Sequence, residues 1–121
     1  MSTYRIVDFA ALPAVPCPCG SARRALADEP AFPGTLHVTQ IRGAAQKHYH
    51  RSLTETYYIL RAEEGSWIEL DDDRVALRES MAVVIPPGVA HRIVGNVDIL
   101  NIVVPNFDPT DEVLVDSDAV D

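Results

Sequence analysis

The chain has 121 residues, of which 47% are hydrophobic and 23% charged, so it is long enough for one domain with a core and too short for two. Its formal net charge of -8 disfavours nucleic-acid phosphates and anionic membrane surfaces as partners. No stretch approaches the roughly 18 consecutive apolar residues of a membrane span, and the N-terminus has no long apolar signal core. We therefore expect one cytoplasmic domain that binds neither nucleic acid nor a membrane.

The N-terminal part, residues 1–34, is expected to be a short Pro-rich arm that contains five of the nine prolines. Its one helix-like run is residues 21–27, where Ser21 can serve as the N-cap of one or two helical turns. The arm can be exposed, can contact a second subunit, or can fold over the main body of the domain.

Two cysteines, Cys17 and Cys19, lie within this arm and are separated by one residue. A disulfide closing so short a loop would be strained and would constrain little of the unfolded chain. Two thiolates with no further ligand nearby also cannot fill a tetrahedral zinc shell. If the arm folds over the domain, either thiol can lie above the site, and Arg23 or Arg24 can meet an anionic substrate.

From residue 35 onward, short β-branched and aromatic runs alternate with turn residues, a pattern typical of antiparallel strands. The predicted strands cover residues 36–41, 54–60, 66–70, 74–77, 82–85, 91–94 and 99–104. Their spacing of about 8–12 residues, with no helical pattern between them, favours an all-β sandwich or barrel over a parallel βαβ fold. We place the barrel core at about residues 35–106.

The C-terminal segment, residues 107–121, holds six of the eighteen acidic residues and no lysine or arginine. We predict a solvated acidic tail, with a partner-binding segment as the alternative. On this prediction, its removal would leave the domain folded.

The histidines and one glutamate form the pattern that carries chemistry. His48 and His50 are one residue apart, so on a strand both imidazoles leave the same face, with Cα atoms roughly 6.5–7 Å apart. Glu55 begins the next predicted strand, and His91 follows the tight turn at residues 86–90, so both can reach the same point. Each residue alone is more often structural, but the joint pattern predicts a mononuclear metal site.

These residues lie in two motifs, G-A-A-Q-K-H-Y-H-R-S-L-T-E at residues 43–55 and P-P-G-V-A-H at residues 86–91. The motifs resemble those of the cupin superfamily, in particular its small single-domain members. One departure is Ser80, which stands where the family has a glycine six residues before Pro86.

The resemblance implies an all-β double-stranded β-helix, the cupin jelly-roll barrel, within a single domain of residues 1–121. It also implies that His48, His50, Glu55 and His91 bind one divalent transition metal ion. Three imidazoles and a carboxylate suit Fe, Mn, Ni, Co, Cu or Zn without choosing among them.

Tyr57 is the nearest ionisable neighbour of the predicted ligands, because strand alternation places it with Ile59 on the same interior face as Glu55. In some cupin lyases a tyrosine at this place acts as a base. The resemblance therefore nominates Tyr57 as a catalytic residue, and interior packing is the alternative.

Other residues near the barrel have more general expected roles. Trp67 is expected to pack or to lie at a dimer interface, and His37 to face solvent or to be hydrogen-bonded. The outward face that carries Tyr58 and Leu60 is consistent with a partner sheet, which predicts a homodimer.

The cupin resemblance alone leaves the reaction open. The leading hypothesis is a metal-dependent enzyme in which a small organic substrate with oxygen donors enters the barrel and is polarised by the ion, with oxygenase chemistry considered first. The alternatives are a metal-dependent isomerase or lyase, and a non-catalytic cupin that binds a small ligand.

Overall fold

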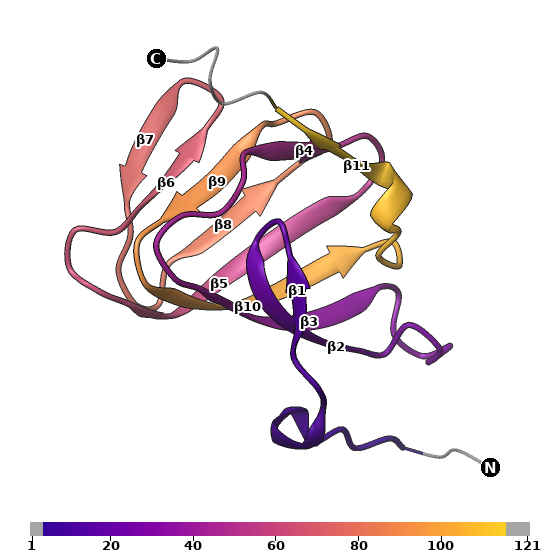
Figure 1. Cartoon of the computed structure of the whole chain (residues 1–121). Helices are drawn as coiled ribbons and strands as arrows, with labels where there is room; N and C mark the ends of the chain where they lie inside the picture. Colours follow the sequence, from indigo (N-terminus) through magenta and orange to yellow (C-terminus); the bar gives the residue numbers. More distant parts are fainter. Residues whose placement is uncertain (1–3, 116–121) are drawn as a thin grey trace.

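The computed structural model describes residues 4–115, which form two antiparallel β-sheets with their inner faces turned toward each other (Figure 1). The six-stranded sheet has the order β1-β2-β3-β10-β5-β8, with bounds Val15–Cys17, Gly20–Ala25, Thr35–Ile41, Val97–Val104, Thr54–Ala62 and Ala82–Ile85. The five-stranded sheet has the order β11-β4-β9-β6-β7, with bounds Glu112–Leu114, His48–His50, His91–Val94, Trp67–Leu70 and Asp73–Ala76. Two short 3-10 helices, η1 (Phe9–Ala11) and η2 (Pro109–Asp111), lie near the ends of the described chain.

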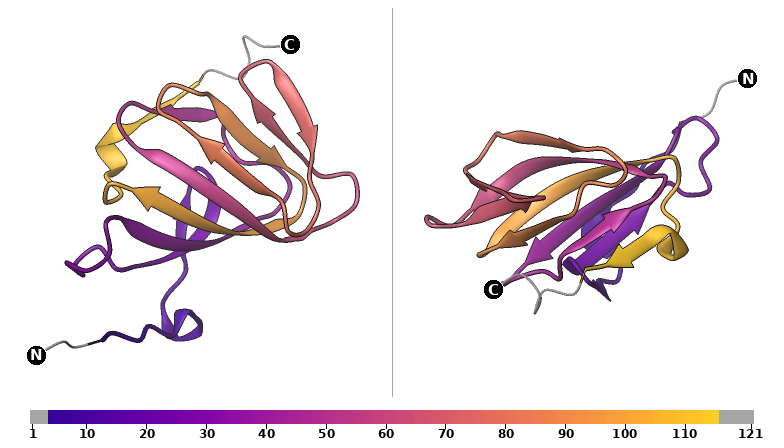
Figure 2. Two further views of the ribbon diagram at one scale, coloured as in Figure 1. Left: turned by 180° about the vertical axis from the view of Figure 1, so that it is seen from behind. Right: turned by 90° about the horizontal axis from the view of Figure 1, so that it is seen from above.

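All seven predicted strands are present, and the all-β cupin jelly-roll architecture is confirmed (Figure 2). Alternating burial explains why the sequence pattern predicted these strands. Along β3 and β10, every second side chain is buried between the sheets, and the residues between them face outward.

Apolar side chains fill the interior next to the start of β10. The register places Val97 beside Ile41, whereas Asn101, further along the same strand, lies beside His37 and Tyr57. The inner face of the six-stranded sheet therefore changes from apolar to polar along β10. The apolar core consists of Ile41, Ala45, Tyr57, Ile59, Ile68, Leu77, Ile85, Ile93, Val97 and Ile99.

The predicted helical run at residues 21–27 is wrong, because Gly20–Ala25 forms strand β2. β2 pairs with β3 over five residue positions, and Ala22 is only 1% exposed. Helix propensity is a weak prior, and here the backbone pairing with β3 overrides it. The expected arm at residues 1–34 is therefore too long, since residues 15–25 belong to the barrel.

The expected solvated tail is also wrong for residues 111–115, although residues 108–110 are exposed as predicted. β11 pairs with β4, and the Asp111 carboxylate accepts hydrogen bonds from the backbone N–H groups of Ser52 and Leu53, both at 3.0 Å. Without β11, the edge of β4 would have backbone N–H and C=O groups without partners, and pairing with β11 supplies these partners. The acidic residues Asp116, Asp118 and Asp121 lie outside the described residues.

The Cys17–Cys19 pair is a disulfide at the turn between β1 and β2, so these thiols are not metal ligands. The carbonyl of Pro18, between them, accepts a hydrogen bond of 2.8 Å from the N–H of Gln46. The tip of the β1–β2 hairpin therefore contacts the segment that leads into β4.

The outer face of β5 carries Tyr58 and Leu60, which are 41% and 42% exposed, as alternation predicted. The homodimer itself stays a prediction. Trp67 is half-buried, donates its indole N–H to Glu69 at 3.1 Å, and lies under the guanidinium of Arg74, as expected of a packing residue. Within residues 4–115, no helix has the length and apolar character needed to cross a membrane.

Candidate metal centre

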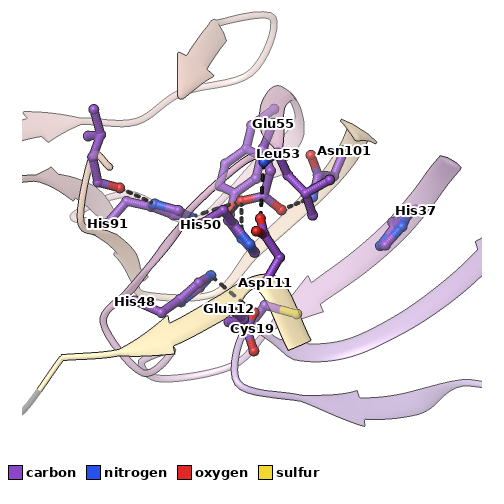
Figure 3. A network of polar contacts seen from close by, with 12 residues as sticks. Cys19, His37, His48, His50, Leu53, Glu55, His91, Asn101, Asp111 and Glu112 are labelled. Atoms are coloured by element: carbon purple, nitrogen blue, oxygen red, sulfur yellow. Dashed lines mark hydrogen bonds and ion pairs between the residues drawn. The ribbon is translucent and has the colours of Figure 1, made fainter. Parts of the chain in front are cut away.

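Four predicted ligands converge in the interior between the sheets (Figure 3). Strand β4 turns His48 and His50 inward, and each is 2% exposed. His91 lies directly across from His48 in the β4–β9 pair, and Glu55 arrives from β5. One donor atom from each residue lies within 4.8 Å of the donor atoms of the other three.

A glycine turn fixes the two motifs relative to each other. Gly88 adopts a φ of 88°, in the left-handed region that a residue with a side chain adopts at a cost, and its N–H donates to the carbonyl of His50 at 2.8 Å. This hydrogen bond joins the turn before His91 to the strand that carries His48 and His50.

Backbone carbonyls orient two of the imidazoles. His48 Nδ1 lies 2.8 Å from the carbonyl of Gln46, and His91 Nδ1 lies 2.9 Å from the carbonyl of Val89. A carbonyl only accepts, so each Nδ1 carries the hydrogen and each Nε2 is left for the centre. This is how metal-binding histidines are commonly held.

The contacts of Glu55 test whether a metal fits this site. Its Oε1 lies 2.9 Å from His91 Nε2 and 3.1 Å from His50 Nε2, so each nitrogen either donates a proton to the carboxylate or shares a cation with it. Both ring nitrogens of His50 are buried and make no hydrogen bond. A metal ion would satisfy these atoms, and three imidazoles with a carboxylate are a suitable donor set.

The protonation states of His48 and Glu55 also suit a metal. Burial, reinforced by the charge of His91, lowers the pKa of His48 from 6.5 to about 4, so this ring is neutral at pH 7. Burial alone would raise the pKa of Glu55, but the contacts with His50 and His91 hold that pKa well below its usual range. His48 and Glu55 are therefore in the forms that bind metal. For His50, burial lowers the pKa but the contact with Glu55 outweighs it and raises the pKa, so a metal ion competes with a proton at this imidazole.

Tyr57 lies beside this centre, as alternation predicted, and is 4% exposed. Its hydroxyl donates to Glu55 Oε1 over 3.5 Å. Burial, together with the charge of Glu55, raises the pKa of Tyr57 well above 10, so the phenol keeps its proton. Its catalytic role stays a prediction.

Two further residues at the centre were not identified from the sequence. Asn101 donates from Nδ2 to Glu55 Oε2 at 2.6 Å, and it has a sequence signal, because it is a polar residue at an inward position of an alternating strand. Glu112 places Oε1 3.6 Å from His48 Nε2, and burial raises its pKa. No local signal marks Glu112, since its position depends on the pairing of β11 with β4.

His37 is hydrogen-bonded, one of the two roles expected for it, and is 3% exposed rather than solvent-facing. Its Nε2 lies 3.0 Å from Thr35 Oγ1, and its Nδ1 accepts a hydrogen bond from Arg24. Figure 3 shows it on β3, apart from the four converging donors.

The sequence matches no protein-family model and no curated protein. Among solved structures, it is similar to a protein from Planctomyces limnophilus, with 41% identity and a TM-score of 0.86 over 92% of this chain and 96% of that one. It is also similar to Pac13 of Streptomyces, a nucleoside dehydratase, with 16% identity and a TM-score of 0.76 over 93% of this chain and 92% of that one.

A third similar structure is the oxalate decarboxylase of Bacillus subtilis, with 15% identity and a TM-score of 0.77 over 95% of this chain and 33% of that one. At such low identity, the likenesses to Pac13 and to this cupin enzyme establish a shared fold and nothing finer. The much higher identity to the Planctomyces limnophilus protein, over nearly the whole of both chains, establishes a common family. The chain thus has a small cupin fold, and it belongs to the same family as the Planctomyces limnophilus protein.

Proposed function

We propose that this cupin is a metal-dependent enzyme for a small organic substrate, with His48, His50, Glu55 and His91 holding one divalent transition metal ion. The observation that carries the proposal is the position of Glu55 Oε1, which lies within 3.1 Å of the Nε2 atoms of both His50 and His91. A cation between these buried oxygen and nitrogen atoms would stabilise their close approach. Fe, Mn, Ni, Co, Cu and Zn all accept this donor set.

When bound, the metal ion would supply Lewis-acid chemistry at an oxygen atom of the substrate. The chain's own contribution is the protonated phenol of Tyr57, which is hydrogen-bonded to Glu55 and shielded from water. A buried phenol that keeps its proton can deliver it to a departing group and recover a proton from the substrate.

This arrangement favours lyase chemistry, in which a group leaves the substrate without the use of dioxygen. Two proteins of the same fold are named for reactions that remove a group, the nucleoside dehydratase and the oxalate decarboxylase. Oxygenase chemistry, the first hypothesis from the sequence, uses the same donor set and is the competing proposal. The complete burial of the four donors supports a third proposal, a cupin that binds metal and ligand without catalysis.

The test begins with elemental analysis of protein purified from its own host, followed by assays on a panel of small oxygen-bearing acids and alcohols. A lyase should turn over under strict anaerobiosis with a redox-inert metal, and Tyr57→Phe should slow it by about 10²-fold. Tyr58→Phe, on the exposed face of the same strand, is the matched control and should leave turnover unchanged.

The other outcomes separate the competing proposals. Substrate-dependent uptake of dioxygen by the iron-loaded protein would support an oxygenase. Ligands that raise the melting temperature without any turnover would support the binding module. Protein from its own host that contains no transition metal would contradict all three.

A further inference from the structure

A row of four inward-facing side chains crosses the inner face of the six-stranded sheet. In the strand register, Arg24 pairs with His37, His37 with Asn101, and Asn101 with Tyr57. The last two of these residues donate hydrogen bonds to Glu55 of the candidate centre. Arg24 therefore lies on the row that leads directly to the predicted metal ligand.

The guanidinium of Arg24 is held in place by two aromatic rings. Its Nε donates to His37 Nδ1 at 3.3 Å, and its Cζ lies 4.5 Å from the centroid of the Phe107 ring. The Phe107 ring also meets the His37 ring edge-on, with centroids 5.1 Å apart. Because His37 Nδ1 accepts from Arg24, the ring hydrogen lies on Nε2 and points to Thr35 Oγ1 at 3.0 Å.

Within residues 4–115, Arg24 is one of five arginines that form no ion pair with a carboxylate, the others being Arg23, Arg51, Arg74 and Arg78. Arg5, Arg42, Arg61 and Arg92 each form an ion pair with a carboxylate. Within residues 4–115, Arg24 forms no ion pair, and its only side-chain hydrogen bond is the one to His37. Both terminal NH₂ groups are therefore uncommitted.

The surroundings of Arg24 make this arrangement costly in the absence of a ligand. Burial lowers the pKa of Arg24, whereas the charges of Glu112 and Glu55 act in the opposite direction. Burial removes part of the hydration of the guanidinium, and its one side-chain hydrogen bond in the described part of the chain, to His37, leaves the two terminal NH₂ groups without a protein partner there. The free fork of a guanidinium matches the two oxygens of a carboxylate.

Asn101 supplies an independent sign of a missing ligand. It is 5% exposed, and while its Nδ2 is committed to Glu55, its Oδ1 has no hydrogen-bond donor. A buried acceptor without a donor is costly, and a hydroxyl group would satisfy it. The row therefore favours a ligand with an anionic group at Arg24 and a hydroxyl group at Asn101.

We propose that Arg24 binds the carboxylate of a small hydroxy-carboxylate substrate whose hydroxyl donates to Asn101 Oδ1. The inference rests on the proposed function, because it names the substrate class of the same centre. His37 and Phe107 are positioning residues that hold the guanidinium with its terminal nitrogens free.

The test compares acids with their uncharged isosteres on the metal-loaded protein. Isothermal titration would measure the affinities of glycolate and lactate beside those of glycolamide and lactamide. Each acid should bind about 10- to 100-fold more tightly than its amide, as expected for a charge-assisted pair. Acetate, which lacks the hydroxyl, should bind about 10-fold more weakly than glycolate.

Variants then assign this preference to Arg24. Arg24→Gln should remove the preference for acid over amide, and Arg24→Lys, which keeps the charge but not the fork, should reduce it severalfold. His37→Leu should also reduce it, because the guanidinium loses its hydrogen-bonded support. Arg23→Gln is the matched control, since Arg23 pairs with the outward-facing Val38, and it should keep the full preference.

The outcomes against the inference are specific. Equal binding of acid and amide, no binding of either acid, or a preference that survives Arg24→Gln would overturn it. Arg24-dependent binding of inorganic phosphate without binding of glycolate would overturn the carboxylate assignment.

Metal content, measured on every variant, separates this inference from the proposed function. Arg24→Gln should keep its metal. Wild-type protein that binds metal but does not distinguish acid from amide refutes the inference alone, whereas protein that binds no metal refutes the proposed centre.

Discussion

The candidate centre and the ends of the described chain are built in different ways. The four metal donors of the centre lie within residues 48–91 and come from two compact motifs on β4, β5 and β9. The groups around it come from the ends, with Arg24 on β2 and Glu112 on β11. The donors thus follow from local spacing, whereas their surroundings follow from pairing between distant segments.

This difference teaches that the chain ends complete the site. β2 covers the edge of β3, and β11 covers the edge of β4, the strand that carries His48 and His50. The same two strands that protect open sheet edges bring a cation and a carboxylate toward the centre. Changes in the middle of the chain and changes at its ends should therefore have separable effects.

The largest effect is expected from the centre itself. His91→Ala removes one of four donors, and metal content measured by elemental analysis should fall close to zero. His37→Ala, which removes a buried histidine outside the donor set, is the matched control and should retain metal. Full stoichiometric metal in His91→Ala would remove His91 from the ligand set.

The next effect comes from the C-terminal end. A chain that ends at Phe107 loses β11 and the hydrogen bonds that the N–H groups of Ser52 and Leu53 donate to Asp111. The free energy of unfolding, measured with urea, should fall by about 3–5 kcal/mol because several backbone groups lose their partners. Metal affinity should fall as well, since β4 loses its neighbour.

The matched control for this deletion is a chain that ends at Val115 and keeps β11. It should have the stability and the metal content of the full chain. Equal stability of the two shortened chains would show that β11 contributes nothing, and the solvated tail expected from the sequence would be restored.

The pH dependence tests the N-terminal end, where Arg24 contacts His37. Burial, reinforced by the charge of Arg24, lowers the pKa of His37 from 6.5 to about 4. Between these values the unfolded chain binds a proton that the folded chain does not, so stability falls as the pH drops from about 6.5 to about 4. The loss due to His37 should approach about 3 kcal/mol.

Urea unfolding of metal-free protein at several pH values would measure this loss. His48, whose pKa is also lowered to about 4, contributes in the same direction, so the contribution of His37 is obtained from the difference between wild type and His37→Gln. Parallel stability curves for the two proteins between pH 7 and pH 4 would contradict a neutral, buried His37.

Much of this fold was predictable because its signals are local. Seven strands follow from β-branched runs and turns, and the four donors follow from the two motifs. β2 was misassigned because its alanines and arginines also suit a helix, and only pairing with β3 decides the matter. Glu112 was missed for the same physical reason, since an acidic residue reads as solvated until its strand has a partner. Asn101 was recoverable from alternation along β10.

The smallest predicted effect lies at Ser80, in the middle of the chain between the two motifs. This residue has a φ of 71°, in the left-handed region, where the resemblance to cupins predicts a glycine. Its N–H donates to the carbonyl of Ile59 at 2.9 Å, and this hydrogen bond survives substitution by glycine. Ser80→Gly relieves the steric cost of the side chain but gives the unfolded chain more conformational freedom, so the free energy of unfolding should rise by only about 0.5 kcal/mol.

Ser80 contributes no metal donor, and the hydrogen bond that it donates to β5 comes from its backbone N–H. Metal content and the preference for glycolate over glycolamide should therefore not change in Ser80→Gly. A change in either quantity would mean that the turn before β8 is coupled to the site, and that the middle of the chain is less independent of its surroundings than the two motifs indicate.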